Sequence, residues 1–332
     1  MAPSSTAKTD RAVVLLQLGG PDSLEAVQPF LYNLFADPDI IDLPGAFMFR
    51  TALARRISKS RAPKVRSLYG RIGGRSPILE QTQQQADSLR EYLVSRGSNV
   101  QVEIAMRYWH PMTDAAVKKI LANKVKEVVL LPLYPHYSKA TTGSSFNEWD
   151  RVARTLGADT IPTRRIQHYF DHPLYIRALV ERIREGLERF SPDERSNVHL
   201  LFSAHGTPLK LVQDGDPYSR HIQKTYEQVL AQGKFGLQHH LCYQSKVGPQ
   251  KWLEPSLTKA IRDLGGSGVK HVLVTPVAFV TDHIETLSEI NIEGRELAES
   301  VGIRQFEMTA PLLTNRSFVE CLGELVLQEF QD

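Results

Sequence analysis

Short apolar runs alternate with longer amphipathic stretches along this chain. The runs are residues 12–18, 100–106 and 127–133 in the first half, and 198–203, 239–243 and 271–277 in the second. A continuous apolar run of this length is typical of a strand that is buried on both faces of its sheet. Between the runs, stretches such as 173–190 begin with proline and carry apolar side chains at helical spacing, which predicts helices. The alternation predicts an α/β protein with parallel sheets.

The two halves of the chain resemble one another. The apolar pattern of residues 125–132 recurs, at a constant offset, in residues 269–276. Each half also opens with an apolar strand that ends in small residues, 15–21 in the first half and 200–208 in the second. We therefore expect two similar doubly wound parallel sheets that face each other, with a ligand cleft between the carboxyl ends of their strands.

The same pattern suggests where the domains begin and end. We expect a flexible tail at residues 1–10, a first domain at 11–163 and a second domain at 164–314. The last segment, 315–332, reads as a helix that packs back on the first domain. A length of 332 residues suits two domains of ordinary size.

The charge of the chain is small overall but unevenly distributed. A formal net charge of +3 gives no reason to expect a nucleic-acid partner. Between Asp42 and Glu80 there is no acidic residue, and a basic block occupies the interval: Arg50, Arg55, Arg56, Lys59, Arg61, Lys64, Arg66, Arg71 and Arg75. Such a block either solvates a helix face or attracts carboxylates, phosphates or an anionic membrane surface, and both readings stay open.

A concentration of large apolar residues, the apolar lip, precedes and overlaps the basic block at residues 30–49. Its members are Phe30, Leu31, Leu34, Phe35, Ile40, Ile41, Leu43, Phe47, Met48 and Phe49. Pro29, Pro38 and Pro44 interrupt this stretch, so it cannot form one long core helix. The lip either packs in the ordinary way, or it grips a flat ligand or dips into a bilayer.

Signals for membrane insertion and for disulfide bonding are lacking in the sequence. No stretch approaches about 18 uninterrupted apolar residues, and the first residues have no apolar core that would suit a signal peptide. Cys242 and Cys321 are the only cysteines, too few for a four-cysteine cluster or a disulfide framework. We expect a reducing, cytoplasmic location, with peripheral contact to a membrane surface as a further expectation.

Candidate chemistry is concentrated after the last apolar run. Glu285, Glu289 and Glu293 are spaced i, i+4 and i+8, which on a helix makes one acidic stripe, with Asp282 and His283 at its head. Like charges at this spacing repel by roughly 0.2–0.5 kcal/mol per pair. The stripe is either a solvated helix face or a path for a cation or for protons, and the adjacent histidine favours the second reading.

A second candidate residue is His205, at the end of the strand that opens the second half. It is followed by Gly206, Thr207 and Pro208, a turn of small residues that leaves room beside the ring. Imidazole is the side chain suited to moving protons near neutral pH. Because strand ends of one parallel sheet are near neighbours, His205 and Glu285 could face one ligand.

Together these features closely resemble the ferrochelatases, enzymes that insert ferrous iron into a porphyrin. The likeness runs from about residue 13 to residue 313. Its motifs, in chain order, are Leu-Gly-Gly-Pro (18–21), Arg-Ile-Gly-Gly (71–74), Ser-Pro-Ile (76–78), Arg-Tyr-Trp-His-Pro (107–111), Leu-Tyr-Pro (133–135), Tyr-Ser (137–138), Thr-Thr-Gly-Ser-Ser (141–145), Ser-Ala-His-Gly-Thr-Pro (203–208), Gln-Ser-Lys-Val-Gly-Pro (244–249) and Asp-His-Ile-Glu-Thr (282–286). The resemblance implies two chelatase-like α/β domains with a porphyrin in the cleft, and a lyase that forms heme.

The resemblance also implies roles on the metal side of the cleft. The family's residue matching His205 is essential, and it either accepts pyrrole protons or meets the metal. The residue matching Glu285 works opposite it. Those matching His283, Glu289 and Glu293 line a route for protons or metal, so these five residues are the expected metal ligands.

On the porphyrin side, the resemblance assigns substrate-binding residues. Those matching Arg61, Tyr69 and Ser76 hold the propionates, and the one matching Arg107 lies in the pocket. Tyr243 stands where several relatives have tryptophan, and we expect it in the pocket as well.

Departures from the family pattern refine the expected cofactor and substrate. Many members hold an iron–sulfur cluster on a C-terminal cysteine extension. This chain stops at Asp332 without one, so we expect no cluster, no tightly bound cofactor and Fe²⁺ only as substrate. Leu18 stands where the coproporphyrin-using branch often has tyrosine, which favours protoporphyrin IX. The alternatives are coproporphyrin III, a chelatase for another tetrapyrrole such as sirohydrochlorin, and a non-catalytic porphyrin or heme carrier.

Overall fold

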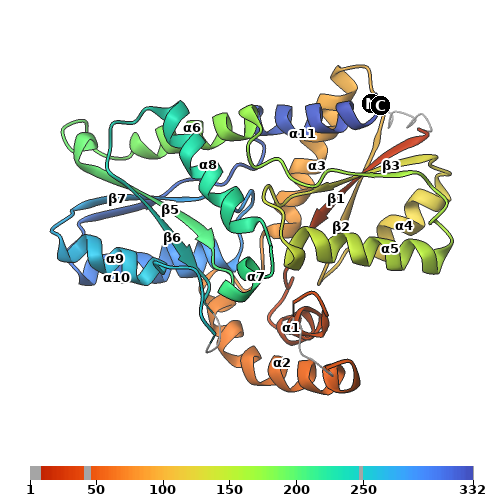
Figure 1. Ribbon diagram of the computed structural model, residues 1–332, viewed down its shortest axis with the longest axis horizontal. Coiled ribbons are helices and arrows are strands. Elements are labelled where there is room, and N and C mark those ends of the chain that lie inside the picture. Colours follow the sequence, from red (N-terminus) through yellow and green to blue (C-terminus); the bar gives the residue numbers. More distant parts are fainter. Residues whose placement is uncertain (1–8, 41–45, 247–249, 332) are drawn as a thin grey trace.

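The computed structural model describes residues 9–40, 46–246 and 250–331, and within them it contains two four-stranded parallel sheets (Figure 1). The first sheet has the order β2-β1-β3-β4, with β1 Arg11–Gln17, β2 Gln101–Met106, β3 Glu127–Pro132 and β4 Thr163–Arg165. The second has the order β6-β5-β7-β8, with β5 Val198–His205, β6 His239–Gln244, β7 His271–Pro276 and β8 Gln305–Met308. The two orders are equivalent, which confirms the predicted pair of similar halves.

Each predicted apolar run is a strand, and the repeat seen at 125–132 and 269–276 contains β3 and β7. The edge strands β4 and β8 were not expected from the sequence. They are short, and β4 is made of Thr163, Arg164 and Arg165, which carry no apolar run. β4 and β8 are therefore strands because they pair with β3 and β7, and not because of their own composition.

Helices cover both sheets. They are α1 Val27–Ala36, α2 Ala46–Arg71, α3 Ile78–Ser95, α4 Thr113–Ala122, α5 Ser144–Leu156, α6 Pro173–Leu187, α7 Leu209–Gln213, α8 Tyr218–Gly233, α9 Leu257–Gly266, α10 Arg295–Ser300 and α11 Arg316–Glu329. Two π-helices, η1 Lys139–Gly143 and η3 Glu285–Gly294, and the short 3₁₀-helix η2 Arg195–Asn197 complete the list. The predicted helix at 173–190 is α6.

Alternate residues of the central strands enter different apolar layers. In β1, Val13 and Leu15 face the layer shared with α3, whereas Val14 and Leu16 face the layer formed with α4 and α5. Burial on both faces explains why these strands read as continuous apolar runs. Each such side chain contributes about 1.5–3 kcal/mol of burial free energy.

One apolar layer is common to the two halves. It joins side chains of β1 and β3 to side chains of β5, β7, α6 and α11. Helix α11 packs against α3 of the first half and also against α6. The first sheet extends through β4 to Arg165, slightly past the boundary expected at 163/164. The division at 163/164 remains a prediction, and of the expected tail at 1–10 only residues 9 and 10 are described.

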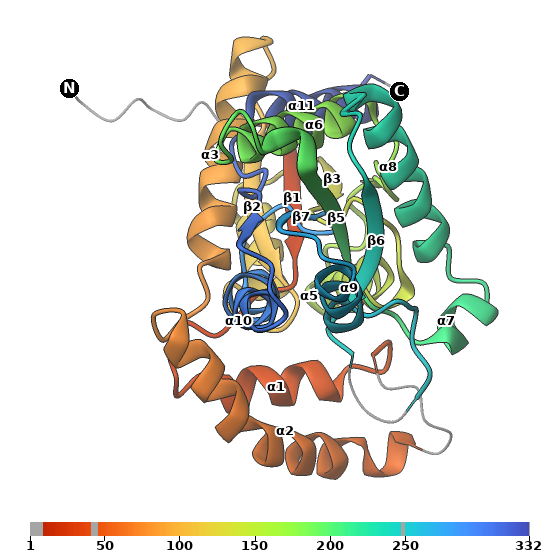
Figure 2. The same cartoon turned by 90° about the vertical axis from the view of Figure 1, so that its left-hand side faces the viewer.

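Helices α1 and α2 lie on one side of the two sheets, opposite α6 and α11 (Figures 1 and 2). Pro29 falls in the first turn of α1, where proline is tolerated. Helix α1 ends at Ala36, and α2 begins at Ala46. Helix α2 packs on α1 and buries the small residues Ala54, Ser58 and Ala62, one turn apart. Small side chains at this spacing allow close helix packing.

The apolar lip divides between buried and exposed positions. Phe30 and Leu31 belong to a buried group, the lip cluster, made of Val27, Phe30, Leu31, Ala62, Tyr69 and Tyr108. Phe49 on α2 is 67% exposed. Ile41 and Leu43 lie outside the described residues, and the side chains of Phe47 and Met48 are not described. No helix of the described ranges has the length and apolar character needed to cross a membrane.

Candidate active site

His205 is the last residue of β5, an inner strand of the second sheet. The turn after it requires glycine, because a Cβ at Gly206 would lie 2.7 Å from the carbonyl oxygen of Gln244. His205 Nδ1 lies 2.6 Å from the Gly206 carbonyl oxygen and donates its proton to it. This contact orients the ring so that Nε2 faces the cleft edge of the sheet.

Glu285 completes a pair with that nitrogen. Its Oε1 lies 3.3 Å from His205 Nε2, and the two side chains are 27% and 37% exposed. Burial opposes charge on His205, but the Glu285 carboxylate more than offsets burial, so the pKa of His205 is raised. Burial likewise opposes charge on Glu285, and the histidine outweighs it, which lowers the pKa of Glu285 to about 2. Both shifts favour the imidazolium–carboxylate form of the pair.

His283 lies on the other side of Glu285 and is a neutral partner. Burial lowers the pKa of His283, against the raising effect of the Glu285 charge. Its Nδ1 accepts the backbone N–H of Glu285 at 3.3 Å, so the 3.4 Å contact between Nδ1 and Glu285 Oε2 is not an ion pair. Phe279 packs edge-on against this ring, with centroids 4.1 Å apart.

The acidic stripe is held on a π-helix, not on the α-helix that its spacing predicted. Such helices are rare and are often found at functional sites. Glu289 accepts hydrogen bonds from Ser245 N–H at 2.7 Å and Ser245 Oγ–H at 2.8 Å, while burial raises its pKa. Glu293 accepts from Ser288 Oγ at 3.4 Å and is exposed. The exposure of the three carboxylates thus increases from the half-buried Glu285 to the exposed Glu293. Only Glu293 fits the alternative of a solvated helix face.

The structure brings together His205, Glu285 and His283, with Glu289 next along η3 and Glu293 at the outer end. Among the residues that the structure describes, no group of three or more His, Cys, Asp or Glu side chains is arranged to hold a metal ion. The donors that are present, oxygen and imidazole, suit a ferrous ion that must be released again.

Tyr69 and Ser76 form the nearest part of the expected porphyrin side. Burial and the Glu285 charge raise the pKa of Tyr69, and the interaction with the Ser76 side chain lowers it. Ile284, next to Glu285, packs on the lip cluster that contains Tyr69. Ser76 N–H donates to the Pro21 carbonyl at 2.8 Å. A Cβ at Gly20 would lie 2.5 Å from Ser76 Oγ, which explains the glycine of the 18–21 motif.

Arg107 pairs with Asp37, a residue that sequence reasoning missed. Arg107 Nη2 lies 3.0 Å from Asp37 Oδ2, and the aspartate side chain is fully buried. Tyr108 Oη donates to the same oxygen at 2.6 Å, and Ser144 Oγ donates to it as well. Asp37 follows α1, so this network ties the apolar lip to the first sheet. No local pattern around Asp37 distinguishes it from an ordinary surface aspartate.

Arg61 and Tyr243 were expected on the porphyrin side. The Arg61 guanidinium stacks over the ring of Phe35, 5.6 Å from its centroid, and Phe35 packs on the lip cluster. Tyr243, near the end of β6, is half-buried, and its Cβ lies close to Gly206. No contact between either residue and the His205–Glu285 pair is recorded among the described residues.

Two solved structures share the fold. SirB from Bacillus subtilis, solved with Fe³⁺, matches with a TM-score of 0.55 at 13% identity, covering 74% of this chain and 89% of that one. DR2241 from Deinococcus radiodurans, a multi-domain protein with structural similarity to chelatases, matches with a TM-score of 0.51 at 12% identity, covering 97% of this chain and 55% of that one. At these identities the likeness shows the fold alone, and the fold is of the chelatase class.

Sequence comparison then identifies the family. The ferrochelatase family model matches residues 10–330. A ferrochelatase of Aquifex aeolicus is 47% identical over 96% of this chain and 99% of its own length. One of Geotalea uraniireducens is 48% identical over 95% of this chain and 96% of its own. The chain belongs to the ferrochelatase family: it is a lyase that forms a metal–porphyrin complex from a porphyrin and ferrous iron.

Proposed function

We propose that the protein inserts Fe²⁺ into protoporphyrin IX, which gives heme b and releases two protons. The observation that carries the proposal is the His205–Glu285 pair, next to which Ile284 packs on the lip cluster that contains Tyr69. A proton acceptor and a carboxylate thus adjoin a residue expected to hold the porphyrin. The five residues of the metal side and the five of the porphyrin side keep the roles that the family resemblance assigns to them.

The pair can supply the base that metallation needs. Pyrrole N–H groups are very weak acids, so metallation needs a base. Because its raised pKa favours the protonated form, His205 Nε2 must lose its own proton before it accepts one from the macrocycle. A cation that approaches Glu285 offsets the negative charge that raises the pKa of His205. The arrival of iron therefore favours the unprotonated form of His205, which can act as the base. His283 and Glu289 can then pass protons outward.

Two features support protoporphyrin IX over coproporphyrin III, which carries four carboxylates instead of two. Leu18 packs against both the lip cluster and the shared apolar layer, so this part of the cleft wall is apolar. Arg107 already neutralises Asp37, which leaves less positive charge for additional carboxylates.

The test is an anaerobic metallation assay with protoporphyrin and coproporphyrin in parallel. We expect the absorbance spectrum of the metallated product to develop faster with protoporphyrin. Faster turnover of coproporphyrin would assign the other substrate. Binding of porphyrin without metallation would identify a carrier, and activity only on sirohydrochlorin would identify a different chelatase.

We also propose that the protein holds no resident cofactor. Cys242 lies buried on β6 of the second sheet and Cys321 on α11, in separate apolar layers, and four thiolates would be needed for the usual iron–sulfur cluster. The purified protein should therefore lack cluster absorption. A visible-region cluster spectrum that survives gel filtration, with stoichiometric sulfide, would contradict this.

Finally, we propose a cytoplasmic enzyme that contacts a membrane surface through the lip. Phe49 is exposed on α2, and Arg55 and Arg56 on the same helix are exposed as well. An apolar anchor beside basic side chains suits anionic lipid headgroups. Phe49→Ser should weaken cosedimentation with anionic vesicles, whereas equal recovery of both proteins would contradict the proposal.

A further inference from the structure

Helix α3 of the first half reaches across to the segment that carries the acidic residues of the second. In its first turn, the Gln81 side-chain oxygen accepts the backbone N–H of Asp282 at 2.6 Å. One turn later, the fully buried Gln85 donates from Nε2 to the Val280 carbonyl at 3.3 Å, with Leu313 O at 3.4 Å. Because the two glutamines are spaced i, i+4, they present one face of α3 to this segment.

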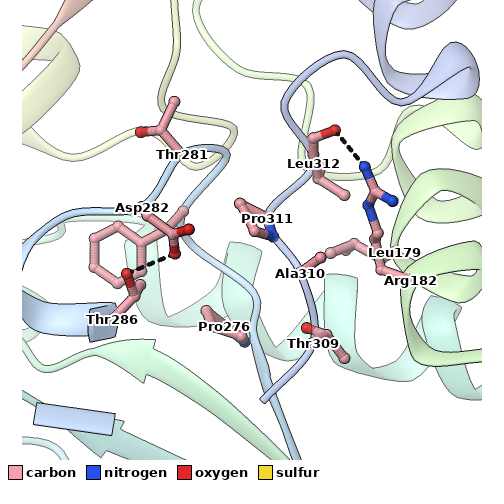
Figure 3. A pocket seen from close by; sticks show the side chains of 11 residues that line it. Leu179, Arg182, Pro276, Thr281, Asp282, Thr286, Thr309, Ala310, Pro311 and Leu312 are labelled. Atoms are coloured by element: carbon pink, nitrogen blue, oxygen red, sulfur yellow. Dashed lines mark hydrogen bonds between the residues drawn. The ribbon is translucent and has the colours of Figure 1, made fainter. Parts of the chain in front are cut away.

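A small cavity lies on another side of the segment. Thr281, Asp282 and Thr286 line this space of about 10 Å³ together with Thr309 and Pro311 (Figure 3). A space of that size holds about one water molecule. Figure 3 also shows the hydrogen bond from Thr286 Oγ to Asp282 Oδ1, 2.9 Å, which fixes the turn internally.

The same helix connects this segment to the porphyrin side. Ser76 lies just before the start of α3, and its Oγ accepts the N–H of Ile78, the first residue of the helix. Gln81 follows less than one turn later. Ser76 and the backbone of Asp282 are therefore linked through the first turn of one helix.

We propose that Gln81 is a positioning residue, which holds the Asp282–Glu285 turn in register with Ser76 and thereby places Glu285 opposite His205. The proposal rests on the proposed function. Gln81 touches neither the His205–Glu285 pair nor the expected porphyrin carboxylate, so it acts through the backbone of Asp282. Gln85 secures the base of the same segment and contributes mainly to folding.

The test compares three variants of the full-length protein. Gln81→Met keeps the size of the side chain and removes the acceptor. Gln81→Asn keeps the amide but shortens its reach by one methylene, and Gln84→Met changes an exposed glutamine of the same helix. We expect Gln81→Met to lower kcat roughly fivefold, the effect of one typical hydrogen bond, with KM for porphyrin unchanged. Gln81→Asn should show a comparable loss, and Gln84→Met should behave as the wild type.

Amide hydrogen exchange gives a readout that needs no turnover. Exchange at Asp282 N–H should be faster in Gln81→Met than in the wild type or in Gln84→Met. Wild-type kcat and unchanged exchange in Gln81→Met would overturn the proposal. If Gln81→Met does not fold, Gln81→Asn decides: wild-type kcat in the folded Asn variant overturns it. Failure of the wild type to metallate any porphyrin would instead refute the proposed function.

Discussion

His205 Nε2 and Glu285 Oε1 lie 3.3 Å apart although the two residues come from different strand ends of the second sheet. His205 ends β5, and Glu285 begins the π-helix that follows β7, the neighbour of β5. The pair joins a group that can accept a proton to one that can meet a cation. Several expected outcomes depend on this contact.

Replacement of His205 by alanine should remove the base. We expect kcat to fall by at least ~10²-fold, the lower end for a lost general base, with the fold intact. Steady-state kinetics and circular dichroism measure the two quantities. His199→Ala, on the same strand but outside the site, is the matched control and should keep its activity. Wild-type kcat in a folded His205→Ala protein would remove His205 from its assigned role.

The pH dependence should reveal the coupling of the pair. Because Glu285 raises the pKa of His205, the acid limb of kcat/KM should lie above the ordinary histidine pKa of about 6.5. Glu285→Gln removes the charge and leaves burial, so the pKa of His205 should fall below that value. An NMR titration of the His205 ring measures this directly, with Glu293→Gln as the exposed control.

The free energy of unfolding should depend on pH through the pKa shifts of His205 and Glu285. The raised pKa of His205 stabilises the fold below about pH 6.5, and this contribution is lost as pH rises through the folded pKa. The lowered pKa of Glu285 stabilises the fold above about pH 4.5, and this contribution is lost as pH falls towards about 2. Glu285→Gln should thus destabilise the protein most between these limits, as measured by urea unfolding at pH 5.5 and 8. An equal loss at both pH values would argue against a charged pair.

Mutations in the acidic stripe should affect the kinetics with iron but not the binding of porphyrin. Glu289→Gln and Glu293→Gln keep the shape and remove the charge, so KM for Fe²⁺ should rise while porphyrin binding stays unchanged. Higher ionic strength should diminish the effect at the exposed Glu293 more than at the inner Glu285, since buried charges are screened less. Normal iron dependence in both variants would show that the stripe is a solvated face.

Arg61→Ala should act on the other substrate. Its guanidinium lies over the ring of Phe35, and we propose that it binds a porphyrin carboxylate. We expect a higher KM for porphyrin and a nearly unchanged KM for iron. Arg56→Ala, an exposed position of the same helix, provides the control. A change in iron KM alone would contradict the assignment.

Asp37→Asn should weaken the attachment of the lip to the first sheet. The buried carboxylate pairs with Arg107 and accepts hydrogen bonds from Tyr108 and Ser144. Loss of one partner of a buried ion pair typically costs about 3–5 kcal/mol. Urea unfolding should show a loss of that order, with Asp39→Asn as the control near the surface. A loss no larger than the control would mean that the network contributes little.

Much of the fold could be predicted from the sequence, because strands buried on both faces leave continuous apolar runs. Those runs located β1, β2, β3, β5, β6 and β7, and the repeated pattern indicated two similar halves. The carboxyl ends of such strands form one edge of a sheet, so His205 and Glu285 could be paired as a hypothesis. Family motifs added the porphyrin-side residues, whose roles remain predictions.

Other features were decided only by tertiary structure. Strands β4 and β8 exist because neighbouring strands pair with them. The acidic stripe lies on a π-helix, where Glu289 accepts a hydrogen bond from Ser245, the residue after β6. Asp37 and Gln81 are ordinary polar residues in the sequence, and they matter through contacts with Arg107 and Asp282, far away along the chain. Periodicity and composition are local properties, whereas these partners lie far apart in the sequence and are brought together only by the tertiary fold.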